Sequence, residues 1–519
     1  MIIRGNLNNT QKTIRNSVIS VIAQICTLML QYFNRKIFIL FLDIEYLGYP
    51  SLFGSVFNLL SVTELGLGGF FAYHLYKEIT SKNDEEIGKL MYLHKCMYQI
   101  VACVVFIGGL ICCFFLPFIV KDATVGWHYL YVIYFLQLLG VVSSFFFSYK
   151  RTLYIATQQE YKCVQVDLFI AVLIQIVQIV TLAVFKNFIL YLCIQISSSV
   201  LSNIIISSRY DREFSNIKSK YTITKDYLKS RNMFSDFKNI IIHRISYAIY
   251  GGADNVIISA ICGVKMVALY GNYYVIQKGI MQVFFYKLLD PVQATIGNIL
   301  YSDRTKDELW DQFEMLDVFS FFFASYIGIG FYVLYQPFII VWLGNDYLLS
   351  DMFVTLLSIT TYLWAVWEIV YKYRNGFGDY KQDRWMMALS AVLNVSISII
   401  GAKIWGVAGV QLGTLISFFP IAYGRVRFVV KNYFNHNIAL YFLKHFGLFL
   451  IVSIEAVLCR MICDMFVVSI LGLLERGLVI LILPTVANCL IHSHNDHYRK
   501  LLHYLKGILK SYGLFGKGQ

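Results

Sequence analysis

Residues 163–185 read CVQVDLFIAVLIQIVQIVTLAVF, and Asp167 is the one charged side chain among them. Residues 187–208 follow directly after Lys186, read NFILYLCIQISSSVLSNIIISS and contain no charged side chain. At 1.5 Å per residue, a helix of about 20 residues crosses the roughly 30 Å hydrocarbon core of a bilayer. Because backbone polar groups in lipid must bond within their own segment, each run predicts a membrane-spanning helix.

Similar apolar runs recur along the whole chain and set its class. Apolar residues make up 58% of the sequence and charged residues only 14%, whereas a soluble domain is about half apolar and a quarter charged. The first run is too long for the apolar core of a signal peptide, so we expect it to be retained. The prediction is an all-α polytopic membrane protein of about fourteen transmembrane helices. The predicted spans are 16–42, 46–74, 96–120, 127–149, 163–185, 187–208, 239–262, 267–288, 313–341, 352–371, 385–403, 406–424, 444–462 and 477–494.

The basic residues are distributed as in a membrane protein rather than a nucleic-acid-binding protein. The net charge is +13, but Lys and Arg lie in short loops between apolar runs, with no contiguous basic domain. With the N-terminus inside, six of the 44 Lys and Arg residues lie in outer loops and five lie within spans. Because positive loops stay on the cytoplasmic side, we expect a multi-pass membrane protein with these loops in the cytoplasm. Both termini should be cytoplasmic, and no nucleic acid partner is expected.

The first twelve spans contain an internal repeat at an offset of 219 to 220 residues. Such parallel repeats are typical of transporters whose halves rock around a central substrate site, and this favours alternating access over a pore. The matching stretches are Ile107-Gly108 with Ile327-Gly328, Leu116-Pro117-Phe118-Ile119 with Gln336-Pro337-Phe338-Ile339, and Glu160-Tyr161-Lys162 with Asp379-Tyr380-Lys381.

The repeat and the charged loops predict a division of the chain into four parts. Residues 1–208 form an N-terminal six-helix bundle, and residues 209–238 form a basic cytoplasmic linker. Residues 239–430 form a second, pseudo-symmetric six-helix bundle. Residues 431–519 add two C-terminal helices and a cytoplasmic tail.

Five charged residues within the spans are candidates for function. A charge near the bilayer centre costs on the order of 3 kcal/mol, so each one needs a reason. Arg35, Arg244 and Lys278 are candidate substrate-binding cations of a hydrated cavity, since cations match the oxygens of a diphosphate. Glu64 and Asp254 are candidate acids for ion coupling or for helix pairing. Snorkelling to an interface or pairing between helices is the structural alternative for Arg35 and Arg244.

The repeat relates two of these residues. Asp254-Asn255 occupies the position of Asn34-Arg35 at an offset of 220 residues. We therefore expect the helices that open each half to present Arg35 and Asp254 at matching depth, facing each other across the cavity, where the two side chains could pair.

The chain also resembles a known family through a series of short motifs in a fixed order. It is similar to bacterial polysaccharide (O-antigen or capsule) flippases of the Wzx type. These belong to the multidrug/oligosaccharidyl-lipid/polysaccharide exporter superfamily. The motifs are Tyr46-Leu47-Gly48, Glu64-Leu65-Gly66-Leu67-Gly68, Leu75-Tyr76-Lys77, Leu116-Pro117-Phe118-Ile119, Ser148-Tyr149-Lys150-Arg151, Asp254-Asn255-Val256-Ile257-Ile258-Ser259, Tyr270-Gly271-Asn272-Tyr273-Tyr274, Trp342-Leu343-Gly344, Arg374-Asn375-Gly376-Phe377-Gly378 and Gly406-Val407-Ala408-Gly409-Val410.

The resemblance implies a V-shaped twelve-helix core with two added helices. It implies movement of undecaprenyl-diphosphate-linked oligosaccharide repeat units from the cytoplasmic to the periplasmic leaflet. The expected partners are the lipid-linked oligosaccharide and membrane lipids, with a polysaccharide polymerase and a chain-length regulator as further candidates. Arg35 is the residue that best corresponds to a cavity arginine on the first helix.

Two other functions remain open at the level of sequence. A cation-coupled multidrug or toxin extruder of the same superfamily would need a cavity suited to cationic substrates. An enzyme of the same pathway would need a large catalytic outer loop, and the sequence has neither that loop nor a Gly-rich nucleotide loop or metal-ligand cluster. We therefore expect no enzymatic activity and no cofactor. The coupling force is left open between a proton, sodium and the membrane potential.

Overall fold

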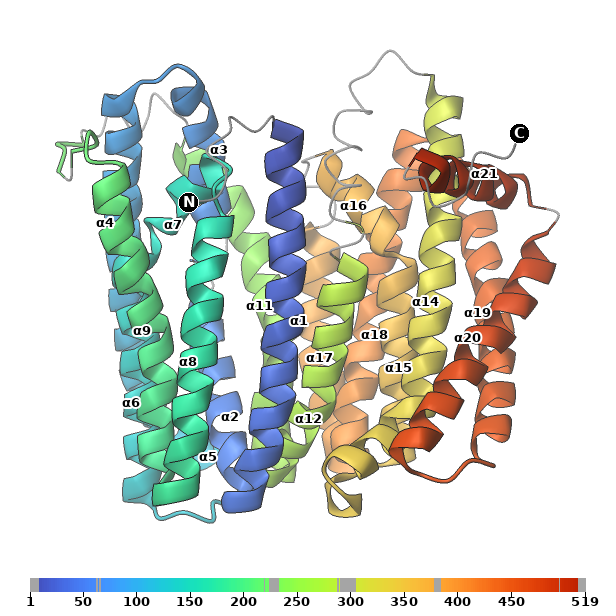
Figure 1. The fold of residues 1–519 in the computed structure, drawn as a ribbon, viewed down its shortest axis with the longest axis horizontal. Helices are drawn as coiled ribbons and strands as arrows, with labels where there is room; N and C mark the ends of the chain where they lie inside the picture. The colour runs from blue at the N-terminus through green and yellow to red at the C-terminus, as the bar shows by residue number, and fades with distance from the viewer. Residues whose placement is uncertain are drawn as a thin grey trace. The chain divides into compact units, whose positions relative to one another are not determined.

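The computed structural model describes residues 9–61, 64, 67–218, 220–223, 233–286, 289, 305–377, 384–493 and 495–511. These residues are mainly helical and contain no strand (Figure 1). Eleven of the described helices are long and apolar enough to cross a bilayer. The predicted first, second and eighth spans, which are not among the eleven, correspond to α1 (Asn9–Phe41), α2 (Glu45–Leu60) with α3 (Leu67–Thr80), and α12 (Val264–Ile280). The prediction of an all-α polytopic membrane protein is confirmed.

The chain forms two compact units, residues 1–272 and 273–519. The first unit includes α11 (Met233–Cys262), which packs along α2. The boundary between the two compact units, after residue 272, therefore lies beyond residues 209–238, where the boundary between the repeats was predicted. Part of that predicted linker lies outside the described residues, and the repeat itself stays a prediction.

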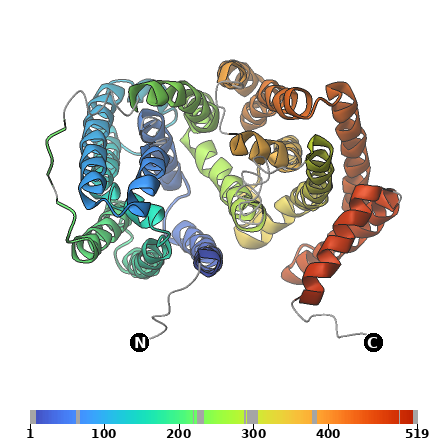
Figure 2. The same ribbon diagram turned by 90° about the horizontal axis from the view of Figure 1, so that it is seen from above.

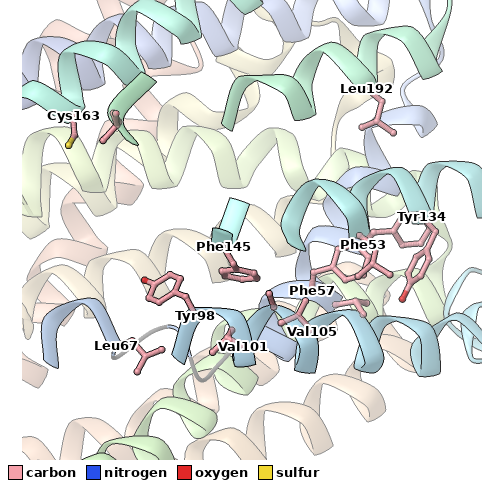
Figure 3. Packing of buried hydrophobic residues seen from close by; sticks show 14 of the residues in the cluster. Phe53, Phe57, Leu67, Tyr98, Val101, Val105, Tyr134, Phe145, Cys163 and Leu192 are labelled. Carbon is pink, nitrogen blue, oxygen red and sulfur yellow. The ribbon is translucent and has the colours of Figure 1, made fainter. Parts of the chain in front are cut away.

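The remaining helices of the first unit surround an aromatic core. Phe53 and Phe57 of α2 pack against Tyr134 of α6 with ring centroids 5.1 Å apart (Figure 3). The buried Tyr134 hydroxyl donates a hydrogen bond of 2.6 Å to the carbonyl of Gly109, which satisfies its polar group within the core. The remaining helices around this core are α4 (Asp84–Cys113), α5 (Leu116–Ile119), α6 (Trp127–Ser148), α7 (Arg151–Ala156), α8 (Tyr161–Phe185) and α9 (Phe188–Glu213).

An ion pair joins three helices at the predicted inner end of the first unit. Arg151 of α7 donates two hydrogen bonds, of 2.7 and 2.8 Å, to the carboxylate of Asp167 on α8, and a third to Asn203 on α9. Burial lowers the pKa of Arg151, but the hydrogen bonds and charge of Asp167 outweigh burial and raise this pKa overall. The bidentate geometry fixes the short α7 between two spans.

The second unit is built around the long helix α14 (Lys306–Trp342), which begins with a capping box between Thr305 and Glu308. The two predicted C-terminal spans, α19 (Ile438–Cys463) and α20 (Ile470–His492), both pack against α14. After a short turn, α21 (Asp496–Ser511) also contacts α14 (Figures 1 and 2). The other elements are the π-helical η2 (Met281–Tyr286) and η4 (Arg427–Tyr433), the 3-10 helix η3 (Asn345–Tyr347), α15 (Asp351–Val366), α16 (Glu368–Gly376), α17 (Arg384–Trp405) and α18 (Val407–Val426).

Glycines allow α17 and α18 to approach at backbone distance. A Cβ atom at Gly409 would overlap the backbone of Gly401. A Cβ atom at Gly413 would overlap Ser398, whose hydroxyl donates to the carbonyl of Val410 at 3.2 Å. Small residues are the usual basis of close helix packing in membranes, where van der Waals contact replaces the hydrophobic effect.

We expect Gly409→Leu to destabilise the second unit by about 1–3 kcal/mol, because the side chain has no space between the two helices. The measurement is thermal unfolding of the purified protein in detergent. Gly330→Leu on α14 is the matched control, since a Cβ atom there meets no atom within 4 Å. Equal midpoints for both variants would show that the two helices are not in backbone contact.

Candidate functional site

Arg35 of α1 is half-buried in the first unit and is held by uncharged groups on α12. Its Nε donates a hydrogen bond to the side-chain oxygen of Asn272, and its Nη2 donates to the carbonyl of Ala268 at 2.9 Å. A Cβ atom at Gly271 would lie 3.1 Å from Nη2, so the glycine leaves room for the guanidinium. Within the described residues, no carboxylate pairs with Arg35. Its positive charge is thus oriented by dipoles without being neutralised.

Amide and phenol side chains surround the same part of α1. Asn34 donates hydrogen bonds to the side-chain oxygens of Gln175 and, at 3.1 Å, Gln178, both on α8. Tyr191 of α9 interacts with both Asn34 and the charge of Arg35. Asn34 and Gln178 are buried. The surroundings of Arg35 are therefore polar but uncharged, which keeps the guanidinium available to an external anion.

Further contacts join α2 to α11 and to the start of α12. The Asn255 amide donates to the Ser55 hydroxyl at 2.9 Å. Near the start of α2, a Cβ atom at Gly48 would overlap the carbonyl of Val264, so the backbones meet closely there. In the predicted orientation, these contacts lie in the outer halves of the helices. They connect the helices that open the first predicted repeat with those that open the second.

Asp254 of α11 is buried, and Tyr270 of α12 donates a hydrogen bond of 3.3 Å to its carboxylate. Arg35 and Asp254 thus both bind α12, through different residues. The structure shows no ion pair between them. The more limited prediction, that both line a cavity, stays a prediction.

Glu64 lies between α2 and α3 and is half-buried. The hydroxyl of Tyr98 on α4 forms a hydrogen bond with its carboxylate. Tyr98 also packs against His94, a fully buried histidine that stacks on Phe71 with ring centroids 4.2 Å apart. Among the described residues, Glu64 is therefore bound by a neutral hydrogen-bond donor beside a group of aromatic rings, and no cation pairs with it.

Lys278 belongs to the second unit and lies in the last turn of α12. Its side chain is exposed and forms no hydrogen bond or ion pair with the described residues. The backbone of Arg244 lies in α11, but its side chain lies outside the described residues. Substrate binding by these two cations stays a prediction. In the part of the chain that the structure describes, no cluster of His, Cys, Asp and Glu could hold a metal ion.

The fold itself can be compared with known proteins. No protein-family model matches the sequence, and no curated protein matches it. Among solved structures, lipid II flippase MurJ in an inward closed conformation superposes with a TM-score of 0.68 at 15% identity, covering 92% of this chain and 99% of that chain. An inward-facing multidrug resistance MATE family transporter of the MOP superfamily gives a TM-score of 0.60 at 14% identity, covering 78% and 98%. A MOP superfamily transporter from Pyrococcus furiosus, described as having a binding pocket of reverse polarity, gives 0.53 at 16% identity, covering 79% and 95%.

The chain shares the fold of these solved structures, two of which are described as MOP superfamily transporters. At these identities the likeness concerns the fold alone.

Sequence reasoning missed the neutral partners of Arg35 in this MOP fold. Asn272 stood within a recognised motif but was given no role. Gln175 and Gln178 lie three residues apart in an otherwise apolar run, so they share one helix face. Polar amides at such spacing were the available signal for a buried polar cluster on α8.

We expect cysteines at positions 55 and 255 to be joined by a short thiol–thiol crosslinker, because these side chains are in hydrogen-bond contact. The variants are made in a background without the eleven native cysteines. The protein is crosslinked and cleaved between α2 and α11, and its gel mobility shows whether the two fragments stay joined. The control pair is Ser55→Cys with Tyr247→Cys, since Tyr247 lies two helical turns, about 12 Å, from Asn255. Equal yields for the two pairs would contradict the α2–α11 contact.

Proposed function

We propose that this protein is a flippase that moves undecaprenyl-diphosphate-linked oligosaccharide repeat units from the cytoplasmic to the periplasmic leaflet by alternating access. The MOP fold supports a transport function, since the compared solved structures of this fold are described as a flippase and as transporters. The proposal includes that the protein is not an enzyme. The more specific part of the proposal is that the transported substrate is a lipid-linked diphosphate, and this part depends on the charge of Arg35.

The uncompensated guanidinium of Arg35 is the observation that carries the choice of substrate. A pyrophosphate carries about two negative charges, and a guanidinium can bind its oxygens through two parallel hydrogen bonds. Arg35 donates one N–H to Asn272 and one to Ala268, and its Nη1 forms no hydrogen bond with the described residues. The side chain is therefore pre-oriented with donors left for an anion.

Alternating access is supported by the contacts of the first unit. Arg35 with Asn272, and Asn255 with Ser55, join the helices that open the two predicted repeats. Arg35 donates two hydrogen bonds to α12, and Asn255 donates two to α2. The net value of such a bond is about 1 kcal/mol between neutral groups and about 1.5–3 kcal/mol for a charged donor. A few such bonds can hold the predicted outer side closed and still separate during a transport cycle.

The remaining roles follow from the same proposal. Lys278 and Arg244 would add positive charge along the substrate path. Glu64 and Asp254 would bind a coupling proton or sodium ion, or stabilise helix contacts. The protein would lie in the bacterial inner membrane with both termini in the cytoplasm. A polymerase and a chain-length regulator would act on the delivered repeat units.

A multidrug extruder is the competing function within the same fold. Its cationic substrates would be repelled by an arginine without a counter-charge, and the contacts of Arg35 are all with neutral groups. Two charges 4 Å apart interact by about 4 kcal/mol near a protein surface, which is enough to decide between an anionic and a cationic ligand.

We expect Arg35→Gln to reduce export of surface polysaccharide on the order of tenfold to a hundredfold, because it removes charge-assisted hydrogen bonds. Arg35→Lys should restore part of the export. The measurement is complementation of a deletion strain, with surface polysaccharide and inner-leaflet lipid-linked repeat units quantified together. The control is Lys36→Gln, which removes the neighbouring, exposed cation.

The two functions give opposite results in this experiment. Accumulated lipid-linked repeat units in the Arg35→Gln strain, with unchanged resistance to cationic dyes, support the flippase. Normal polysaccharide in the deletion strain, together with sensitivity to such dyes, would refute it and support the extruder.

A further inference from the structure

Glu455 lies in the middle of α19, which sequence analysis places outside the duplicated core. Its side chain is enclosed by the second unit, with a relative exposure of 4%. Neither carboxylate oxygen has a hydrogen-bond partner among the described residues. An ionised carboxylate in such surroundings costs several kcal/mol. A neutral, protonated carboxyl avoids that cost.

Another buried acid in the same unit, Asp317, shows how an ionised carboxylate is stabilised by hydrogen bonds and cations there. Asp317 of α14 accepts a hydrogen bond of 2.8 Å from Tyr441 and another of 2.8 Å from Lys444, both on α19. The ring of His445 lies 3.2 Å from the same carboxylate, and Lys444 also binds Glu314 at 2.6 Å. Among the described residues, the bundle therefore provides several donors to Asp317 and none to Glu455. This contrast separates a structural carboxylate from a carboxyl that can exchange a proton.

A phenol connects the surroundings of the two acids. Tyr362 of α15 is close enough to interact electrostatically with both Asp317 and Glu455. Its hydroxyl is buried and has no hydrogen-bond partner among the described residues. Tyr362 also lines a cavity of about 200 Å³, together with Ser358 and with Ser453 of α19. Glu455 does not line this cavity, whose wall is mainly apolar, so the hydroxyl groups, including that of Tyr362, are the groups that can bind water entering it.

We propose that Glu455 is a proton-binding site of the second unit, with Tyr362 and the adjoining cavity as its connection to water. In the packed arrangement the carboxyl carries a proton. When α19 moves away from α14 and α15, water reaches the carboxyl, and the proton passes from Glu455 to water and leaves a solvated carboxylate. Repacking requires that a proton return. Proton binding is thereby coupled to the packing of α19 against α14 and α15 within the second unit.

The other titratable groups near Glu455 do not neutralise it. Tyr362 faces it from α15, and Cys459 faces it from the next turn of α19. Asp317 of α14 lies on the other side of Tyr362 and is already paired. Within the described residues, α14, α20 and η4, which also pack against α19, place no cation in an ion pair with Glu455. A proton is therefore the ligand of this site that removes its charge.

The test of the site is infrared difference spectroscopy of the purified full-length protein in detergent. We expect wild type minus Glu455→Gln to show the C=O stretching band of a protonated carboxylic acid at neutral pH, and this band should disappear as pH rises. Asp464→Asn is the matched control on the same helix, because that side chain is 71% exposed. This variant should leave the acid band unchanged.

Three results would overturn the site. One is an acid band of equal size in wild type and Glu455→Gln at every pH, since Glu455 would then be ionised. Another is a band that persists up to the pH of unfolding, since the proton would then not exchange. The third is failure of Glu455→Gln to fold, because a neutral amide of the same shape replaces a protonated carboxyl without loss.

The link from this proton to translocation rests on the proposed function and has a separate readout. In inverted membrane vesicles, an imposed pH difference should accelerate translocation of a pyrophosphate-linked polyprenol by wild type and Asp464→Asn. Glu455→Gln should lose that acceleration. If no variant translocates the lipid, the proposed function fails while the infrared result stands. If Glu455→Gln still responds to the pH difference, the link from Glu455 to translocation is wrong.

Discussion

The proposed transport depends on how the guanidinium of Arg35 is held inside an apolar protein. Arg35 is oriented by an amide oxygen and a backbone carbonyl on α12, and no described carboxylate cancels its charge. A protein that used this arginine only to join helices would gain most from an acidic partner, as α7 and α8 do with Arg151 and Asp167. Neutral partners fix the direction of the side chain and keep its electrostatic potential. That combination suits a site that must bind and then release an anion.

Two kinds of polar contact join the helices, ion pairs and hydrogen bonds to neutral groups. Arg151 with Asp167 in the first unit, and Lys444 with Asp317 in the second, are tight ion pairs that join neighbouring helices. Such pairs resist separation, because a broken pair leaves an uncompensated charge. The contacts of Arg35 and Asn255, by contrast, are hydrogen bonds to neutral groups between helices of different predicted repeats. We infer that the ion pairs lie within rigid parts and that the weaker bonds lie where parts separate.

The sequence predicted the helical class and order because long apolar runs leave a chain in lipid few alternatives. It also identified Arg35, since a cation within a span is rare enough to be noticed. It could not predict the partners of Arg35. The repeat offset of 220 residues suggested Asp254, whereas the observed contacts with Asn272 and Ala268 depend on how α12 is rotated about its axis. Glu455 received little weight as a residue outside the repeat. Its significance lies in the absence of a partner, which only packing reveals.

The most direct test of the central claim is the affinity of the purified protein for a polyprenyl pyrophosphate, measured against a polyprenyl alcohol of equal length. The account predicts that the wild-type protein prefers the pyrophosphate, that the preference weakens at high salt, and that Arg35→Gln loses most of it while Lys36→Gln keeps it. Equal affinity for the two lipids, or an unchanged preference in Arg35→Gln, would contradict the account.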